Sequence, residues 1–193
     1  QQKGQSLGVL HGVPVTVKDA LQTKNLKSTG GATELRENIP SQDAAAVASI
    51  RREGAIVMGK TNLPRWSGDI QAYNDIFGTT NNPWDISRGP GGSSGGAAAA
   101  VAMGFTSFEI GTDIGGSIRF PAAFNGVWGH KPSFGVIPTT GYLDHVDGGL
   151  NEADINVFGP ITRSAEDLEL LLKVMKRNSP PWVANLGAAP KDL

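Results

Sequence analysis

The feature that most constrains this chain is a glycine- and serine-rich segment that leads directly into an alanine-rich stretch. Residues 89–96 read Gly-Pro-Gly-Gly-Ser-Ser-Gly-Gly, and residues 97–103 are mostly alanine. Because alanine is the best helix former, we predict that the glycine-rich loop opens a helix. The first N–H groups of a helix lack partners within it, so serines placed there are exposed to polarisation. A flexible Gly/Ser linker is the alternative interpretation.

A second motif lies at residues 111–121, which read Gly-Thr-Asp-Ile-Gly-Gly-Ser-Ile-Arg-Phe-Pro. Two consecutive glycines before a serine allow a tight turn with several backbone N–H groups pointing the same way. That is the geometry that an oxyanion hole requires. The alternative is a plain turn in which Arg119 forms a structural salt bridge with Asp113.

Lys18 ends a predicted strand over residues 13–18, where β-branched residues alternate with polar or small ones. A lysine at a strand end is most often a solvated charge. Its neighbours on the N-terminal side are apolar, however, and burial would lower the pKa of the amine. A buried Lys18 could then act as a neutral base.

The order of strand and helix signals predicts an α/β fold with a mixed, mainly parallel sheet flanked by helices. The first strand is followed by a helix that Ser41 caps and that runs to about Arg52, and then by a buried strand over residues 55–58. Further along we predict a strand over 105–110, a turn over 111–117, a short helix over 118–124, a strand over 127–130, a mostly irregular stretch over 132–160, and a helix over 165–176 that Ser164 caps.

One match in the sequence is misleading. Residues 54–61 fit the phosphate-loop pattern G-x-x-x-x-G-K-[ST] letter by letter. A phosphate loop follows a strand and keeps an open interior, whereas here a helix precedes and the interior is Ala-Ile-Val-Met. We therefore interpret this segment as a connection from a helix into a strand and expect no nucleotide there.

Composition excludes several classes of protein. The formal net charge is −1, which argues against a nucleic-acid partner, and the chain has no cysteine, which excludes a disulfide scaffold and a thiolate metal site. No apolar run is long enough to span a membrane. We expect a cytoplasmic protein. His11, His130 and His145 lack metal-ligand spacing, and we interpret them as structural, although a Ser-His-Asp triad stays open.

Lys18 and the two glycine-rich motifs together resemble the amidase signature family. The resemblance extends from about residue 8 to residue 176 and includes Gly-Lys-Thr-Asn at 59–62, which also accounts for the misleading phosphate-loop match. Members of the family are much longer than this chain. We therefore expect residues 1–178 to form a partial amidase signature domain, and residues 179–193 to form a Pro- and Gly-rich tail leading to an absent C-terminal part.

The resemblance implies a Ser–Ser–Lys triad: Lys18 as base, Ser93 as the bridging serine after a cis peptide at 92–93, and Ser117 as nucleophile. Ser93 lies 75 residues after Lys18 and Ser117 lies 24 residues after Ser93, which suits the family's arrangement. No metal and no organic cofactor are implied. The implied oxyanion hole consists of the backbone N–H groups of Ile114, Gly115, Gly116 and Ser117, and the supporting residues are Ser94, Asp113 and Arg119.

The function implied by the resemblance is hydrolysis of a small linear carboxylic amide through an acyl-enzyme intermediate, with hydrolysis of a cyclic amide or a carbamate as an open alternative. One alternative is an amidotransferase subunit of the same family. Those subunits usually carry Gly-Ser-Ser-Thr-Glu-Asn-Ser before Phe-Gly, and residues 68–75 lack that pattern, which favours a free-standing amidase. The other alternative is a catalytically inactive, truncated remnant that self-associates, as a homo-oligomer or by pairing with the missing part of the domain.

Overall fold

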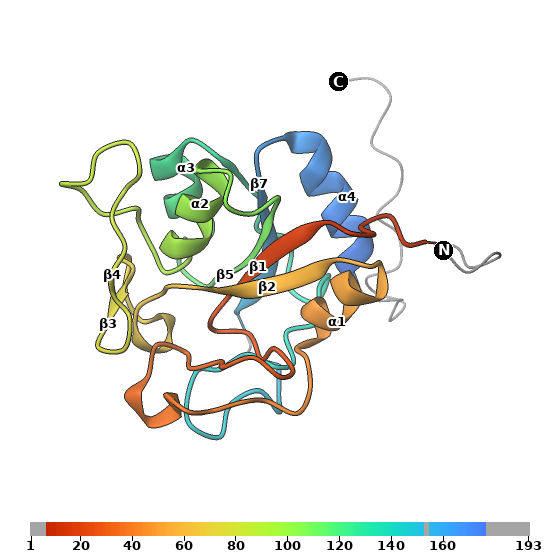
Figure 1. Cartoon of the computed structure of the whole chain (residues 1–193), viewed down its shortest axis with the longest axis horizontal. Coiled ribbons are helices and arrows are strands. Elements are labelled where there is room, and N and C mark those ends of the chain that lie inside the picture. Colours follow the sequence, from red (N-terminus) through yellow and green to blue (C-terminus); the bar gives the residue numbers. More distant parts are fainter. Residues whose placement is uncertain (1–6, 153–154, 177–193) are drawn as a thin grey trace.

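A computed structural model describes residues 7–152 and 155–176 (Figure 1). The tail expected over residues 179–193 lies outside the described residues. Within the described ranges, no helix is both long and apolar enough to cross a membrane.

The strand that carries Lys18 lies in the middle of the molecule. It is β1 (Pro14–Lys18), which pairs in parallel with β2 (Ile56–Thr61), and α1 (Ala45–Arg52) connects the two strands. The other side of β1 lies along β5 (Glu109–Asp113) and the residues just before it, where the Thr16 N–H donates to Thr106 Oγ1 at 2.9 Å. β1 therefore lies between β2 and β5 (Figure 1).

The remaining strands pair in antiparallel fashion. β7 (Val157–Thr162) lies between β5 and β6 (Trp128–Gly129), and β3 (Tyr73–Asn74) pairs with β4 (Gly78–Thr79). The predicted α/β class with a mixed sheet and flanking helices is confirmed. The parallel share is smaller than expected, because β1 and β2 form the only parallel pair among the described strands. The other helical segments are α2 (Gly95–Ala102), α3 (Arg119–Asn125), α4 (Ala165–Met175) and the short 3-10 turns Thr33–Leu35 and Arg65–Ser67.

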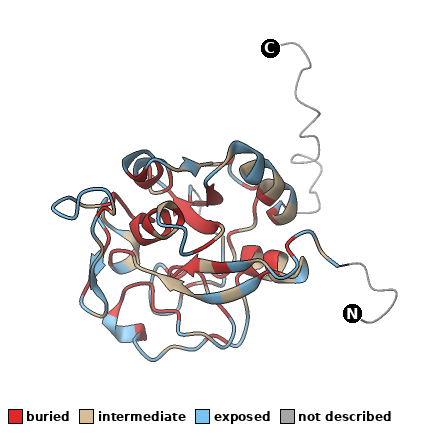
Figure 2. Ribbon diagram, turned by 45° about the horizontal axis from the view of Figure 1, so that its top comes forward, coloured by how far each residue is buried: buried red, intermediate tan, exposed pale blue. Residues whose placement is uncertain are grey.

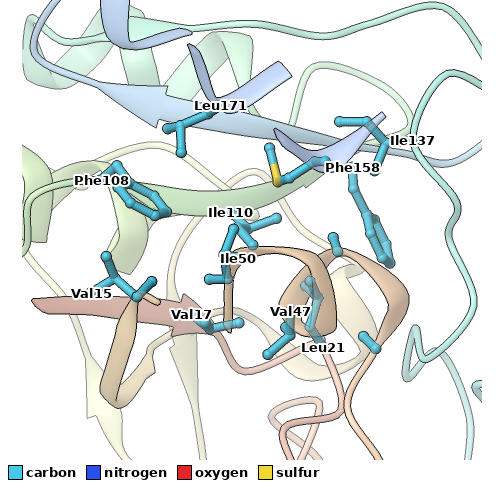
Figure 3. Close-up of a cluster of buried hydrophobic side chains, with 14 of the residues drawn as sticks. Val15, Val17, Leu21, Val47, Ile50, Phe108, Ile110, Ile137, Phe158 and Leu171 are labelled. Atoms are coloured by element: carbon cyan, nitrogen blue, oxygen red, sulfur yellow. The ribbon is translucent and has the colours of Figure 1, made fainter. Parts of the chain in front are cut away.

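Helices cover both faces of this layer, and the alternation of side chains along β1 divides its residues between them. Val15 and Val17 point into a large apolar core with side chains of α1, β5 and α4, such as Ile50 and Leu171 (Figure 3). On the other face α2 and α3 cover a smaller cluster formed by Ala97, Ala98, Val101, Ile118 and Ile161.

Lys18 is offset from Val17 by one residue and therefore points away from the large core, toward α2, which packs on β1. Buried residues concentrate between the two helical layers, and exposed residues lie on α3 and α4, whereas α2 contains none (Figure 2). The pattern of alternation thus places the amine inside the molecule rather than at its rim.

Three element boundaries differ from the sequence-based predictions. α1 begins at Ala45 rather than after Ser41, because backbone carbonyls take the place of a side-chain cap: Ala45 N–H donates to Thr140 O at 3.1 Å. β5 covers Glu109–Asp113 rather than 105–110, so the first three residues of the second glycine-rich motif are strand and not turn. β7 lies in a stretch that was expected to be mostly irregular.

Candidate active site

Lys18 is the largest side chain that is completely buried in the described structure, with 0% exposure. Its Nζ donates to three hydroxyl oxygens: Ser93 Oγ at 2.6 Å, Thr112 Oγ1 at 2.7 Å and Ser94 Oγ at 3.1 Å. All three partners are neutral. The amine is therefore fully hydrogen-bonded, but no carboxylate contacts it.

The pKa of Lys18 reflects that environment. Burial disfavours the charged ammonium form and lowers the pKa to about 7, against the opposing influence of the Glu109 and Asp113 carboxylates, which raise it. A large fraction of Lys18 is consequently neutral near physiological pH and able to accept a proton.

The first glycine-rich segment is a fixed loop and not a flexible linker. Both Ser93 and Ser94 are fully buried, Ser94 precedes the first residue of α2, and the Gly92–Ser93 peptide is cis, as the family resemblance implied. A Cβ on Gly92 would lie 2.1 Å from the backbone oxygen of Gln71. Glycine is required there because the neighbouring backbone approaches too closely for any side chain.

The second glycine-rich turn meets the first. Ser94 N–H donates to Ser117 O at 3.1 Å, and Ser94 Oγ accepts from Thr112 N–H at 3.2 Å. Ser117 is half-buried, whereas Ser93 is fully enclosed. Lys18 on β1, Ser93 and Ser94 therefore form one network, and Ser117 joins it through its backbone oxygen. Among the described residues, the Ser117 side chain donates to none of the three.

Three of the four amides expected to form an oxyanion hole are unpaired. The N–H groups of Ile114, Gly115 and Ser117 donate to no acceptor among the described residues, and the first two residues are exposed. Gly116 differs from the expectation, because its N–H already donates to Asp113 Oδ1 at 2.8 Å. The turn can thus offer three donors to a ligand, while the fourth holds the turn in shape.

The salt bridge that the alternative interpretation of this turn assigned to Asp113 and Arg119 is present, with Arg119 Nη2 at 2.9 Å from Asp113 Oδ1. Asp113 Oδ2 also accepts from Ile118 N–H at 3.0 Å. Burial alone would raise the pKa of Asp113, but the guanidinium and these amides outweigh it and keep that pKa below its usual value. The carboxylate therefore stays ionised and ties the turn to the start of α3.

Two residues that contact this site were not singled out from the sequence. Thr112 lies inside the second motif, next to Asp113, and its hydroxyl could only be assigned to Lys18 once β1 and β5 were known to be neighbours. Asn125 Nδ2 donates to Pro90 O and Pro121 O, both at 2.7 Å, and so fastens the first glycine-rich loop to α3. No local pattern in the sequence indicated that contact.

The segment that matched the phosphate-loop pattern forms β2, so its interior is strand, as expected. Lys60 does not face an open loop. Its Nζ donates to Leu21 O, to Thr23 Oγ1 at 2.8 Å and to Ser28 Oγ at 3.1 Å. This lysine ties the segment that follows β1 to β2.

The histidines lie apart from this network. Within the described ranges, no side chain of His11, His130 or His145 contacts Ser93 or Ser117. The same ranges contain no group of three or more His, Cys, Asp or Glu side chains that could hold a metal ion. Among the described residues, the side-chain hydrogen bonds of Ser93 and Ser94 therefore come from Lys18 and the second motif, and the histidines contribute none.

Comparison with known proteins gives a consistent result. The family model named Amidase matches residues 1–191. The chain belongs to the amidase signature family. Among curated relatives of this amidase signature chain, a glutamyl-tRNA(Gln) amidotransferase subunit of Alkaliphilus metalliredigens is 39% identical over 190 residues, which are 98% of this chain and 38% of that relative.

Solved structures of family members share the fold. A peptide amidase from Stenotrophomonas maltophilia superposes with a TM-score of 0.80 at 34% identity, over 91% of this chain and 36% of that one. A bacterial aryl acylamidase gives a TM-score of 0.81 at 33% identity, over 91% and 36%. This amidase signature chain thus spans well under half the length of the relatives that it matches.

Proposed function

We propose that this chain carries the catalytic network of an enzyme that cleaves carboxylic amide C–N bonds by acyl transfer to Ser117. The observation that carries the proposal is the 2.6 Å contact between Lys18 Nζ and Ser93 Oγ, in a buried site that the Ser94–Ser117 backbone hydrogen bond joins to the second motif. An amide carbonyl is a poor electrophile, so the reaction needs an activated nucleophile and donors for the developing negative charge.

We propose the following first half of the reaction. Neutral Lys18 accepts the Ser93 hydroxyl proton, and Ser93 in turn takes the proton of Ser117 Oγ. Ser117 Oγ then forms a bond to the carbonyl carbon, and the C=O electron pair moves onto oxygen. We propose that the free N–H groups of Ile114, Gly115 and Ser117 bind this oxyanion, each contributing about 3 kcal/mol.

The second half reverses the proton path. The tetrahedral intermediate collapses, the C=O bond re-forms and the C–N bond breaks. The departing nitrogen takes a proton from Ser93, which Lys18 replaces. Water then donates a proton to the same relay and attacks the acyl-Ser117 ester. The bond between the acyl carbon and Ser117 Oγ breaks, and Ser117 Oγ takes the proton back from Lys18 through Ser93, which releases the carboxylic acid and restores neutral Lys18. Thr112 and Ser94 hold the amine in line throughout.

The test is hydrolysis of a simple aryl amide by the wild type and by Ser117→Ala, Ser93→Ala and Lys18→Ala. We expect each variant to lose about 10³-fold or more in kcat/KM, because the three groups act as one unit. His130→Ala is the control and should retain activity, since its side chain is outside the network. Full activity in Ser117→Ala, or loss of activity only in the histidine variant, would contradict the proposal and favour a histidine-based hydrolase.

A second candidate function is favoured by the relatives, several of which are named as glutamyl-tRNA(Gln) amidotransferase subunits. Both candidates share acyl transfer to Ser117 and differ in the acyl donor. Release of ammonia from glutamine, faster than cleavage of an aryl amide, would favour the amidotransferase function. The opposite preference would favour the free-standing amidase, as the divergent residues 68–75 suggest.

A further inference from the structure

Glu109 is a buried carboxylate that the proposed mechanism does not use. It lies on β5 with 0% exposure, and its Oε1 accepts from Thr61 Oγ1 at 2.7 Å, while its Oε2 accepts from Ile110 N–H at 2.9 Å. Thr61 belongs to β2, on the far side of β1 from β5. The Glu109 side chain therefore crosses β1 to reach its partner.

That crossing occurs at the level of Lys18. In the parallel pairing of β1 with β2, Thr61 is the register partner of Lys18. Paired residues on neighbouring strands direct their side chains to the same face of a sheet. The Glu109 carboxylate, the Thr61 hydroxyl and Lys18 consequently lie on one face, the face that α2 covers.

The other buried charges near Lys18 are already paired. Asp19 follows Lys18 directly and lies 3.8 Å from Lys60 Nζ, which comes from β2. Asp113 on β5 lies 2.9 Å from the Arg119 guanidinium, which comes from α3. Each of these two carboxylates has a cation of its own.

Glu109 and Lys18 have no such partner. Within the described part of the chain, Glu109 forms no ion pair, and Lys18 contacts only hydroxyl groups. The other elements packed on this region, α2 (Gly95–Ala102) and β7 (Val157–Thr162), contain no ionisable side chain. Lys60, the ion-pair partner of Asp19, also exerts a weaker influence on Glu109. Apart from that influence, Glu109 and Lys18 are the buried groups whose charges are left to balance each other.

We infer that Glu109 is a positioning residue whose negative charge sets the pH at which Lys18 gains and loses its proton. The inference rests on the proposed function only in taking Lys18 as the base. When Lys18 accepts the proton of the relay, the nearby carboxylate stabilises the new ammonium through space. Glu109 would thus favour proton transfer without touching the substrate.

The pKa of Lys18 supports this coupling. Glu109 is the largest of the charged influences that raise the pKa of Lys18 against burial. Burial in turn raises the pKa of Glu109 to about 7, against the hydrogen bonds from Thr61, Thr16 and Ile110 and the positive charge of Lys60, which lower it. Because the two pKa values lie in the same range, an electrostatic interaction between the groups would make each titration depend on the proton of the other.

The test is an NMR titration of the whole protein with lysine labelled at Cε and Nζ. Glu109→Gln removes the charge and keeps the shape, so the midpoint of Lys18 should fall by about one pH unit. Glu109→Asp should restore most of the shift. Glu169→Gln, which removes an exposed partner of Lys173, is the matched control and should leave the Lys18 midpoint unchanged.

A reciprocal measurement covers the case in which Glu109→Gln does not fold. In Lys18→Met, loss of the positive charge should raise the midpoint of the Glu109 carboxyl carbon by a similar amount, because the coupling is mutual. An unshifted Lys18 midpoint in folded Glu109→Gln, or an unshifted Glu109 midpoint in Lys18→Met, would overturn the inference.

Neither titration requires turnover, so the inference and the proposed function can fail separately. A further measurement is the pH dependence of the rate at which a fluorophosphonate labels Ser117. In Glu109→Gln, the midpoint at which this rate increases with pH should lie about one pH unit lower than in the wild type. Shifted titrations without any labelling would support the coupling and refute the function. Normal labelling with unshifted titrations would support the function and refute the coupling.

Discussion

At the scale of single residues, the central fact is a lysine whose amine is completely buried among hydroxyl groups. An ammonium has three N–H donors, and Lys18 has three acceptors at 2.6–3.1 Å. The neutral amine has two donors and a lone pair, so one hydroxyl must turn to donate to it. Ser93, the closest partner, is the residue that passes the proton in the proposed relay.

The first prediction concerns this base. Wild-type kcat/KM should rise with pH through about 7, because the neutral form of Lys18 is the active one. Lys18→Ala should be about 10³-fold less active at pH 7 and should regain part of that loss toward pH 10, where hydroxide replaces the missing base. Measurement of kcat/KM from pH 6 to pH 10 checks this. Parallel profiles for the two proteins would contradict it.

Sequence patterns identify some of these residues and not others. Ser93, Ser117 and the Asp113–Arg119 pair lie in glycine-rich motifs, and the resemblance of these motifs to the family, rather than their composition, implies their roles. Thr112 and Glu109 have no such local signal. Their proximity to Lys18 depends on β5 lying beside β1, which is a consequence of strand order and not of spacing along the chain.

At the scale of elements, α4 is the helix for which sequence and structure agree best. Ser164 caps it, and Ser164 Oγ accepts from Asp167 N–H at 3.1 Å. We predict that Ser164→Ala lowers the free energy of unfolding by about 1 kcal/mol, because that N–H loses its acceptor. Ser164→Thr keeps the hydroxyl and is the control. Urea denaturation measures both, and equal losses would argue against the cap.

In the first turn of α2, replacing glycine by alanine should destabilise the protein, which is the opposite of its usual effect in a helix. Gly→Ala usually stabilises a helix by about 1 kcal/mol. A Cβ on Gly96, however, would lie 2.5 Å from the backbone of Asn62. We therefore predict that Gly96→Ala destabilises the protein by about 2 kcal/mol.

The matched control for this prediction is Gly59→Ala. Gly59 lies on β2, and a Cβ there would meet nothing within 4 Å, so the free energy of unfolding should change by no more than about 0.5 kcal/mol. Thermal unfolding of both variants compares the two sites. A stabilised Gly96→Ala would show that α2 does not approach β2 this closely.

The elements that sequence patterns missed have physical explanations. β7 contains Gly159-Pro160, and proline is normally excluded from a central strand, so no local pattern in this segment indicates a strand. β5 includes Gly111, where glycine reflects crowding rather than a turn: a Cβ would lie 2.9 Å from Ser94 Oγ. Tertiary contacts, which no local pattern reports, decide both cases.

At the scale of the whole molecule, burial of Lys18 links stability to pH. The folded-state pKa of about 7 lies below the ordinary value of 10.5. A group whose pKa is lower in the folded than in the unfolded protein contributes stability at pH values above its unfolded-state pKa. That contribution is lost as the pH falls through its folded-state pKa. The stability contributed by Lys18 should therefore increase between pH 7 and pH 10.

Lys18→Met removes this dependence and keeps much of the volume. Between pH 7 and pH 9, the wild type should gain about 2 kcal/mol in free energy of unfolding relative to Lys18→Met. Hydroxyl groups that lose their partner in the variant do not titrate in this range, so they shift the difference by a constant, and the higher midpoint expected for Glu109 in Lys18→Met would add to the gain of the wild type. A difference that stays flat with pH would mean that Lys18 keeps its proton in the folded state.

The most direct measurement is the site at which an active-site-directed fluorophosphonate attaches. Trypsin releases Ser93, Ser94 and Ser117 on one peptide, residues 89–119, so fragmentation spectra must locate the adduct. We predict one adduct per chain, on Ser117, with a rate that increases as Lys18 loses its proton and no adduct in Ser117→Ala. An adduct on another serine, or undiminished labelling of Lys18→Ala at pH 7, would contradict the lysine–serine relay.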